Sequence, residues 1–410
     1  MNVSPDFSLP LRVIAPYFLT GAFFYTLSMG YLWFADPAVS AADMRLLAWT
    51  HAYMVGFVMS VIVGAMGQLC VVVGEVHHRY PALFVWIAPI LGIGSMLLFA
   101  GFAFDPFWLI AGGGLIVAAL GLFAWDLFLT VRRSRRRTAV IRSMQWSTFF
   151  LGIGLAVGIA MAGGYAGAWP IDPSRWLPLH LMTVFGGYVL LNVMGVSTVL
   201  LPMFGACERF SDNDHAFSFY AMIAAVAAMI LSALLQTGWL EGISLGAALF
   251  SMLHYLRVVY RIFTSKKRRY ADIWERSLTV AFIALVGCVG IGIYGYVTGD
   301  EKSVLTAFWL LMAGFIGFLI TGHLYKIVPF LVWFERFAPR LDEEEVPMIH
   351  QLLPTRLADA QWGSALAGVA AIAVSLWLQS GWLWQAGAAM LFLSGVLLIA
   401  VIVKVLRYRV

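Results

Sequence analysis

The chain has 410 residues, of which 62% are hydrophobic and 11% are charged, and its formal net charge is +5. Soluble globular proteins carry about a quarter charged residues, so this composition excludes a soluble globular chain and indicates an integral membrane protein. The positive charge is explained by basic loops between apolar stretches, and it gives no reason to expect nucleic acid as a partner.

Twelve apolar stretches follow one another, each near the ~20 residues that an α-helix needs to cross about 30 Å of hydrocarbon. We therefore predict an all-α membrane protein with twelve transmembrane helices in a single domain, 1–410, whose main partner is the lipid bilayer. The stretches lie at 11–35, 44–74, 82–103, 107–131, 144–167, 176–206, 215–236, 239–263, 277–297, 303–334, 362–379 and 382–404.

Two recurring markers predict three pseudo-symmetric repeats of four helices, at roughly 1–140, 141–275 and 276–410. A Trp-Leu pair opens a helix at residues 108, 239 and 382, and Gly195 and Gly322 are each followed seven residues later by proline and then by Glu-Arg-Phe. Gly64 begins a looser copy. The interval from this glycine to the Trp-Leu pair is 44 residues in the first two repeats and 60 in the third, where a polar segment, Leu341 to Gln361, is inserted.

The orientation in the membrane follows from basic clusters after the fourth, eighth and twelfth stretches. These clusters are Arg132, Arg133, Arg135, Arg136 and Arg137; Lys266, Lys267, Arg268 and Arg269; and Lys404, Arg407 and Arg409. Basic loops lie on the cytoplasmic side, so we expect a bacterial inner-membrane protein with both termini in the cytoplasm. The segment Met1 to Pro10 has no basic region before a short apolar core, and no cleaved signal peptide is expected.

The second helix of each repeat is the longest and carries polar residues, and polar groups in hydrocarbon are costly unless they face the protein interior. The stretches 44–74, 176–206 and 303–334 are therefore predicted to be inner helices around the functional centre. Their glycines, among them Gly56, Gly64 and Gly187, either permit ordinary close helix packing or leave room for a flat ligand.

His51 and His180 are the leading candidates for cofactor ligands. They are 129 residues apart, nearly one repeat, and each lies within seven residues of the outer end of its helix. Both are then about 10 Å or less below the outer interface, where two neutral imidazoles can bind a transition metal or the axial positions of a haem iron. The alternative is that each histidine only forms a hydrogen bond with a neighbour.

His323 and His254 are further candidates, for a cofactor and a metal respectively. They lie at comparable depth in the membrane, and either form a second site or are buried, hydrogen-bonded histidines. On equivalent helices His323 and His51 differ by about 21 Å along the axis, so they cannot bind the same iron. The remaining histidines, His77, His78, His215 and His350, are expected in solvent.

Two charged residues near the inner ends of helices, Lys326 and Asp126, are expected to extend toward cytoplasmic water, and the alternative is a role in a proton relay. The three scattered cysteines, Cys70, Cys207 and Cys288, show no spacing typical of a disulfide framework or a thiolate metal site and are predicted to pack as apolar residues.

Twelve helices in three arcs, with histidines near the outer ends of inner helices, resemble the catalytic subunit of the haem-copper oxidase superfamily. The stretch Thr50 to Phe57 looks like the segment that supplies a low-spin haem ligand, and the segments from His180 to Gly187 and from Gly322 to Leu331 look like bacterial relatives of that subunit. A more distant likeness is to the haem and copper membrane proteins of nitrosative stress.

The resemblance implies haem of b type as cofactor, either alone or together with one copper. It does not extend to the full oxygen-reducing centre, because the seventh helix lacks the family's His-His pair and the third-repeat position equivalent to His51 falls near Ala307 to Trp309. His180 matches the family's first copper ligand. The expected function is electron transfer or nitric oxide handling, without cytochrome oxidase activity.

Two other functions remain open on the sequence. One is a transporter or assembly factor, without haem, that moves a metal or small solute through the repeat interface. The other is a cofactor-free subunit that docks to a respiratory or electron-transfer partner through the acidic part of the inserted segment, Asp342, Glu343, Glu344 and Glu345. Whether the protein is an enzyme is left open.

Overall fold

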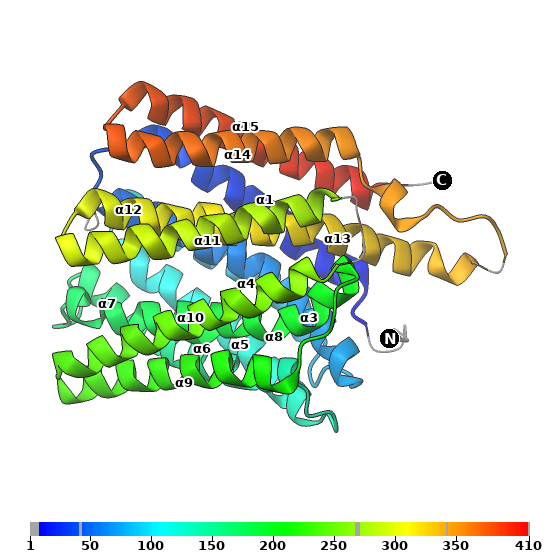
Figure 1. Ribbon diagram of the computed structural model, residues 1–410, viewed down its shortest axis with the longest axis horizontal. Coiled ribbons are helices and arrows are strands. Elements are labelled where there is room, and N and C mark those ends of the chain that lie inside the picture. The colour runs from blue at the N-terminus through cyan, green and yellow to red at the C-terminus, as the bar shows by residue number, and fades with distance from the viewer. Residues whose placement is uncertain (1–7, 41–42, 267–270, 342, 409–410) are drawn as a thin grey trace. The chain divides into compact units, whose positions relative to one another are not determined.

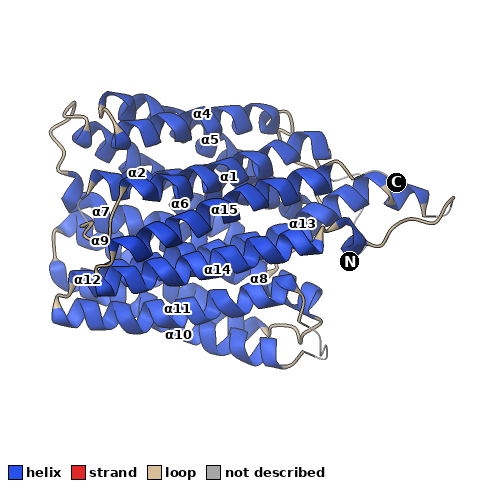
Figure 2. Cartoon of the chain, turned by 90° about the horizontal axis from the view of Figure 1, so that it is seen from above, coloured by secondary structure: helices blue, strands red, loops and turns tan. Residues whose placement is uncertain are grey.

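The computed structural model describes residues 8–40, 43–266, 271–341 and 343–408, and every regular element in these ranges is a helix (Figure 1 and Figure 2). Within them, twelve helices are long and apolar enough to cross a membrane. The predicted all-α membrane class with twelve spans is therefore confirmed. Contacts between residues divide the chain into two compact units.

The first unit comprises the described residues 8–9, 66–97 and 106–266. It holds the end of α3 (Ser60–Gly74), most of α4 (Leu83–Ala103) and the complete elements α5 (Phe107–Arg132), α6 (Ala139–Tyr165), α7 (Pro173–Leu181), η4 (Met182–Leu190), α8 (Leu191–Gly205), α9 (Asp212–Leu235) and α10 (Gly238–Thr264). Helix α6 packs on α5, η4 and α8, while α9 and α10 form an antiparallel hairpin, shown in green in Figure 1.

The second unit comprises the described residues 10–40, 43–65, 98–105, 271–341 and 343–408. Besides the start of α3 and the end of α4 it holds α1 (Leu11–Tyr31), η2 (Leu32–Phe34), α2 (Met44–His51), η3 (Ala52–Met59), α11 (Ile273–Thr298), α12 (Glu301–Trp309), η5 (Leu310–Ile316), α13 (Gly317–Arg336), η6 (Ala338–Arg340), η7 (Ile349–Leu352), α14 (Thr355–Leu378) and α15 (Gly381–Leu406). Helix α15 packs on both α14 and α1, and α11 packs on α12, η5 and α13.

The predicted inner helices are the longest and most buried spans of the described chain. They run over Met44–Gly74, Pro173–Gly205 and Glu301–Arg336, and 78%, 61% and 72% of their apolar cores are buried, against 28–50% for the other nine. The prediction that their polar residues turn them inward is confirmed. The arrangement of the chain as three four-helix arcs stays a prediction.

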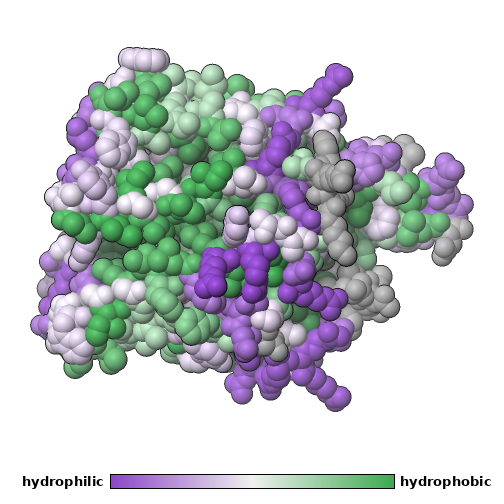
Figure 3. Space-filling model, in the orientation of Figure 1, coloured by the Kyte–Doolittle hydropathy of each residue, from purple (hydrophilic) through white to green (hydrophobic). Residues whose placement is uncertain are grey.

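The helix surfaces that do not pack on other helices are apolar, as expected for contact with lipid. Trp239, Ile243, Phe250 and Leu253 on α10 are all exposed. Figure 3 shows hydrophobic colouring along the middle of α9 and α10, and hydrophilic colouring at the end where α9 begins and α10 ends. This surface is therefore suited to contact with a lipid bilayer.

Three predicted helices begin several residues earlier than expected: those predicted to start at 144, 277 and 362 begin at Ala139, Ile273 and Thr355. The stretch predicted at 362–379 begins at Thr355, so the last part of the inserted polar segment belongs to α14. Polar residues can continue this helix because they find partners: the carboxylate of Asp359, for instance, accepts a hydrogen bond from Arg276 of α11. Some earlier expectations fall outside the described residues, namely those on residues 1–7, 267–269, 342 and 409.

Candidate functional site

Each of the three inner spans contains a π-helical segment. An α-helix (α2, α7 or α12) leads into a π-helix (η3, η4 or η5), which continues as a second α-helix (α3, α8 or α13). The π-helices begin at residues 52, 182 and 310, close to the period of the sequence markers. Hydrogen bonds from residue i to i+5 widen the helix, and such segments in proteins occur frequently at functional sites.

Both leading candidate ligands lie at the end of an α-helix that leads into a π-helix. His51 is the last residue of α2, and His180 is the penultimate residue of α7. The corresponding residue of the third inner span is Trp309, the last residue of α12, whose indole Nε1 donates a hydrogen bond to the carbonyl of Val369. The first two inner helices thus present imidazoles where the third presents an indole.

The His51 ring is held by its own helix and by a neighbouring aromatic ring. Its Nδ1 lies 2.7 Å from the carbonyl oxygen of Leu47, so Nδ1 carries the proton and donates it. The ring stacks on Phe102, with 4.5 Å between centroids and 25° between planes. In the neutral ring Nε2 keeps its lone pair, and among the described residues it has no hydrogen-bond partner.

The His180 ring is held by helix α6. Its Nδ1 donates to the carbonyl oxygen of Gly154, 3.1 Å away. One turn further along α6, a Cβ added at Gly158 would lie 2.9 Å from Cε1 of His180, so the absence of a side chain there makes room for the imidazole. A histidine whose Nδ1–H is fixed by a backbone carbonyl is the form commonly found among metal ligands.

The two other candidates are hydrogen-bonded histidines within their own units. His323 lies in α13, after η5 rather than before it; its Nδ1 donates to the carbonyl of Leu319 at 2.7 Å. His254 lies in α10, and its Nδ1 is 2.7 Å from the hydroxyl oxygen of Ser218. His51 and His323 belong to the second unit, and His180 and His254 to the first. Among the described residues, no three His, Cys, Asp or Glu side chains gather where they could hold a metal ion.

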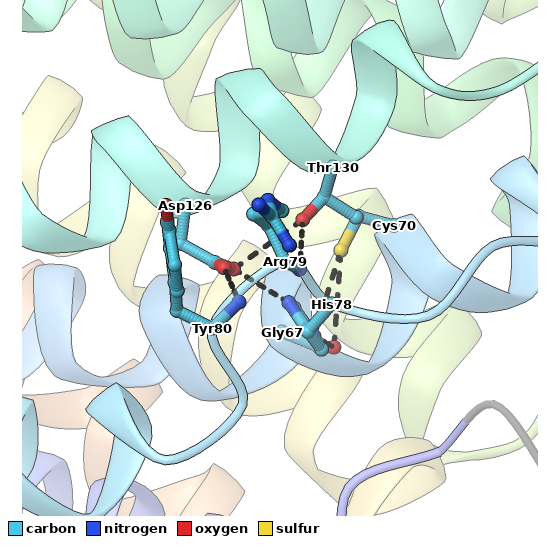
Figure 4. A network of polar contacts seen from close by, with 7 residues as sticks. All are labelled: Gly67, Cys70, His78, Arg79, Tyr80, Asp126 and Thr130. Carbon is cyan, nitrogen blue, oxygen red and sulfur yellow. Dashed lines mark hydrogen bonds and ion pairs between the residues drawn. The ribbon is translucent and has the colours of Figure 1, made fainter.

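The structure contains a buried ion pair that the sequence did not predict. His78 was expected in solvent and Asp126 near cytoplasmic water, yet their side chains are 1% and 0% exposed, and His78 Nδ1 lies 2.6 Å from Asp126 Oδ2 (Figure 4). The other ring nitrogen, Nε2, lies 2.6 Å from the carbonyl oxygen of Gly67 and 3.9 Å from the Cys70 sulfur. Since carboxylate and carbonyl oxygens only accept, both ring nitrogens donate and the imidazole is charged.

The network fixes the loop between α3 and α4 onto α5. The backbone N–H of Tyr80 donates to Asp126 Oδ1 at 2.6 Å, and that of Arg79 donates to Thr130 Oγ1 at 3.0 Å (Figure 4). Burial lowers the pKa of His78, but its hydrogen bonds with Asp126 and Cys70 raise it by more, to about 10. The signal available in the sequence was an aspartate inside an apolar stretch, which needs a buried cationic partner.

Two further expectations need correction. His215, expected in solvent, is buried: Nε2 lies 3.2 Å from the Ser143 hydroxyl, and the ring stacks on Phe219. Lys326 does not extend freely into water, because its Nζ donates to Asp272 Oδ2 at 2.7 Å, with both side chains about one quarter exposed, 27% and 26%. Cys70 is buried as expected, while Cys207 and Cys288 are half-buried free thiols.

Neither of two comparisons with known proteins places the chain in a family. No family model matches the sequence, and no curated protein is significantly similar to it. The functional assignment therefore depends on the residues of the inner helices themselves.

Proposed function

We propose that this protein is a haem-binding inner-membrane protein that acts in electron transfer or nitric oxide handling, with His51 and His180 as residues that would bind haem of b type. The proposal is supported by the position and the hydrogen bond that the two histidines have in common. Each lies within two residues of the start of a π-helix of an inner span, and each is held by a carbonyl oxygen at Nδ1. That hydrogen bond directs Nε2 toward a ligand.

The donor set suits haem. Neutral imidazoles are common protein ligands of haem iron, so either histidine would supply a suitable nitrogen ligand. When bound, the haem would supply one-electron redox chemistry. The protein would hold the ring tautomers through the carbonyls of Leu47 and Gly154 and, in Phe102, provide an apolar wall beside one imidazole. In a second form of this proposal, a copper ion binds beside His180 and His254 in addition to the haem.

The proposal also includes the orientation derived from the basic loops, with both termini in the cytoplasm. His51 and His180 are then close to the periplasmic face, and the haem would exchange electrons with a partner on that side. Under this arrangement the loop that is anchored by His78 and Asp126 lies on the cytoplasmic side.

Substitution of the ligands provides the direct test. In protein expressed with an adequate haem supply, His51→Ala and His180→Ala are each expected to lose much of the Soret absorbance, because an imidazole ligand is removed. His350→Ala, at an exposed position in η7, is the matched control and should keep the wild-type spectrum. Undiminished absorbance in the double variant would refute the ligand assignment, and metal analysis of the same samples tests for copper.

The space beside His180 offers a subtler test. Gly158→Ala is expected to displace the imidazole, since the new Cβ would lie 2.9 Å from Cε1, and so to lower haem occupancy. Gly152→Ala, on the same helix, is the control because an added Cβ there meets nothing within 4 Å. Haem content per chain, measured as the pyridine haemochrome, should fall only in the first variant. Equal content in both would show that the ring position does not matter.

A further inference from the structure

A pocket of about 240 Å³ opens in the first unit beside the start of α7 and the turn between α9 and α10. It lies at the end of α10 opposite the one that approaches Lys266. Its lining combines apolar side chains with polar ones, of which the four that carry the argument are Arg175, Gln236, Thr237 and Glu241.

The polar groups of this pocket are not satisfied by the chain. Arg175 and Glu241 carry opposite charges and line the same pocket, but neither has an ion-pair or hydrogen-bond partner among the described residues. The guanidinium of Arg175 lies 6.0 Å from the centre of the Trp176 ring. The hydroxyl oxygen of Thr237 is buried without a hydrogen-bond partner, and it does not cap α10. Such a group is costly unless something else binds it.

The second unit contains a matching turn, and there the chain's own side chains occupy the corresponding place. There the turn Gln379-Ser380-Gly381-Trp382 corresponds to Gln236-Thr237-Gly238-Trp239, and Gln236 and Gln379 have nearly the same backbone φ, 57° and 51°. The residue that corresponds to Glu241 is Trp384, whose buried indole donates to the carbonyl of Leu32.

The glutamine of the matching turn is also engaged, and the pocket that Trp384 lines is small. Gln379 donates to the carbonyl of Pro37, 3.0 Å away, whereas Gln236 has no such bond. The pocket lined by Trp384 measures only about 30 Å³. In the first unit a carboxylate replaces the indole, and space remains next to two unpaired opposite charges.

From this geometry we propose that the pocket binds a zwitterion, with its acid group on Arg175 and its primary ammonium on Glu241, and that the Thr237 hydroxyl completes the site. A guanidinium binds phosphate or carboxylate oxygens, and a carboxylate accepts hydrogen bonds from an ammonium. Two sources share this chemistry: the phosphoethanolamine headgroup of a membrane lipid, and a soluble zwitterion from the aqueous phase. Exposed Leu234, Leu235 and Trp239 next to the turn provide an apolar surface for acyl chains.

The test is native mass spectrometry of the full-length protein, delipidated in detergent and then offered equal amounts of phosphatidylethanolamine, phosphatidylcholine and phosphatidylglycerol. We expect phosphatidylethanolamine to be retained over the other two, since choline has no N–H to donate and phosphatidylglycerol lacks the cation. Loss of a charge-assisted hydrogen bond lowers affinity by roughly tenfold or more. That loss is expected in Arg175→Gln and in Glu241→Gln.

Two variants complete the design. Glu241→Trp copies the matching turn and should abolish selective retention, while Gln379→Ala changes the matching turn and should leave it unchanged. If the protein does not discriminate among the three lipids but binds soluble phosphoethanolamine with the same dependence on Arg175 and Glu241, the proposed site is confirmed. Its ligand is then a soluble molecule. If wild type retains the three lipids equally and binds no phosphoethanolamine, or if both charge variants behave as wild type, the proposal is overturned.

Discussion

Replacement of Asp126 by asparagine is expected to destabilise the protein by about 3–5 kcal/mol, because it leaves one member of a buried ion pair without its counter-charge. The two side chains are almost completely buried, at 1% and 0% exposure, and their closest atoms are 2.6 Å apart. The loss should be visible as a lower apparent transition temperature in detergent. Glu75→Gln removes a carboxylate from the exposed pair with Arg136 and serves as the control, with an expected cost of about 0–1 kcal/mol.

The same pair predicts how stability depends on pH. The pKa of His78 is raised to about 10, above the ~6.5 of a free histidine, so the protonated ring stabilises the fold fully below about pH 6.5. This contribution is lost as the pH rises through about 10. A melting series from pH 6 to 10.5 should show the decline in wild type and a much weaker one in Asp126→Asn. Parallel curves for the two proteins would contradict a charged His78.

The second large effect is expected at Gly56, in the π-helix η3. A Cβ added there would lie 2.3 Å from Cγ and 2.4 Å from Cδ1 of Phe24, a ring only 2% exposed in α1, so neither helix can yield easily. Overpacking of this kind costs about 1–3 kcal/mol. We therefore expect Gly56→Ala to lower the apparent transition temperature clearly.

Gly114→Ala is the matched control, because an added Cβ in α5 meets nothing within 4 Å. In a helix an alanine is favoured over glycine by roughly 0.5–1 kcal/mol, so this variant should be as stable as wild type or slightly more stable. If both variants melt together with wild type, the close approach of α1 to η3 is not tight. If both are destabilised alike, the effect of Gly56→Ala reflects helix flexibility instead of packing.

The global features of the fold follow from composition and periodicity. Twelve apolar stretches predicted the twelve spans, and polar residues such as Asn192 and Tyr325 identified which helices are buried, because the penalty for polar groups in lipid acts on each helix separately. The π-helices could not be predicted. The same apolar residues can form an α-helix or a π-helix, and packing around the segment decides which of the two forms.

The site was predictable only in part, and the errors have a common cause. His78 and His215 lie close to the ends of apolar stretches, where sequence alone favours solvent, but each contacts a residue far away in the chain: Asp126 for the first and Ser143 for the second. Sequence alone also cannot distinguish a tightly packed glycine from one with open space beside it. Gly56 faces an aromatic ring while Gly114 faces open space, and only tertiary contacts distinguish them.

The central proposal is that the imidazoles of His51 and His180 are ligands of haem. An absorption spectrum of the purified wild-type protein, oxidised and then reduced, together with the haem content per chain, tests this most directly. We expect a Soret band in the oxidised protein, α and β bands after reduction, and haem that copurifies with the chain. A colourless protein from cells with ample haem would contradict the proposal.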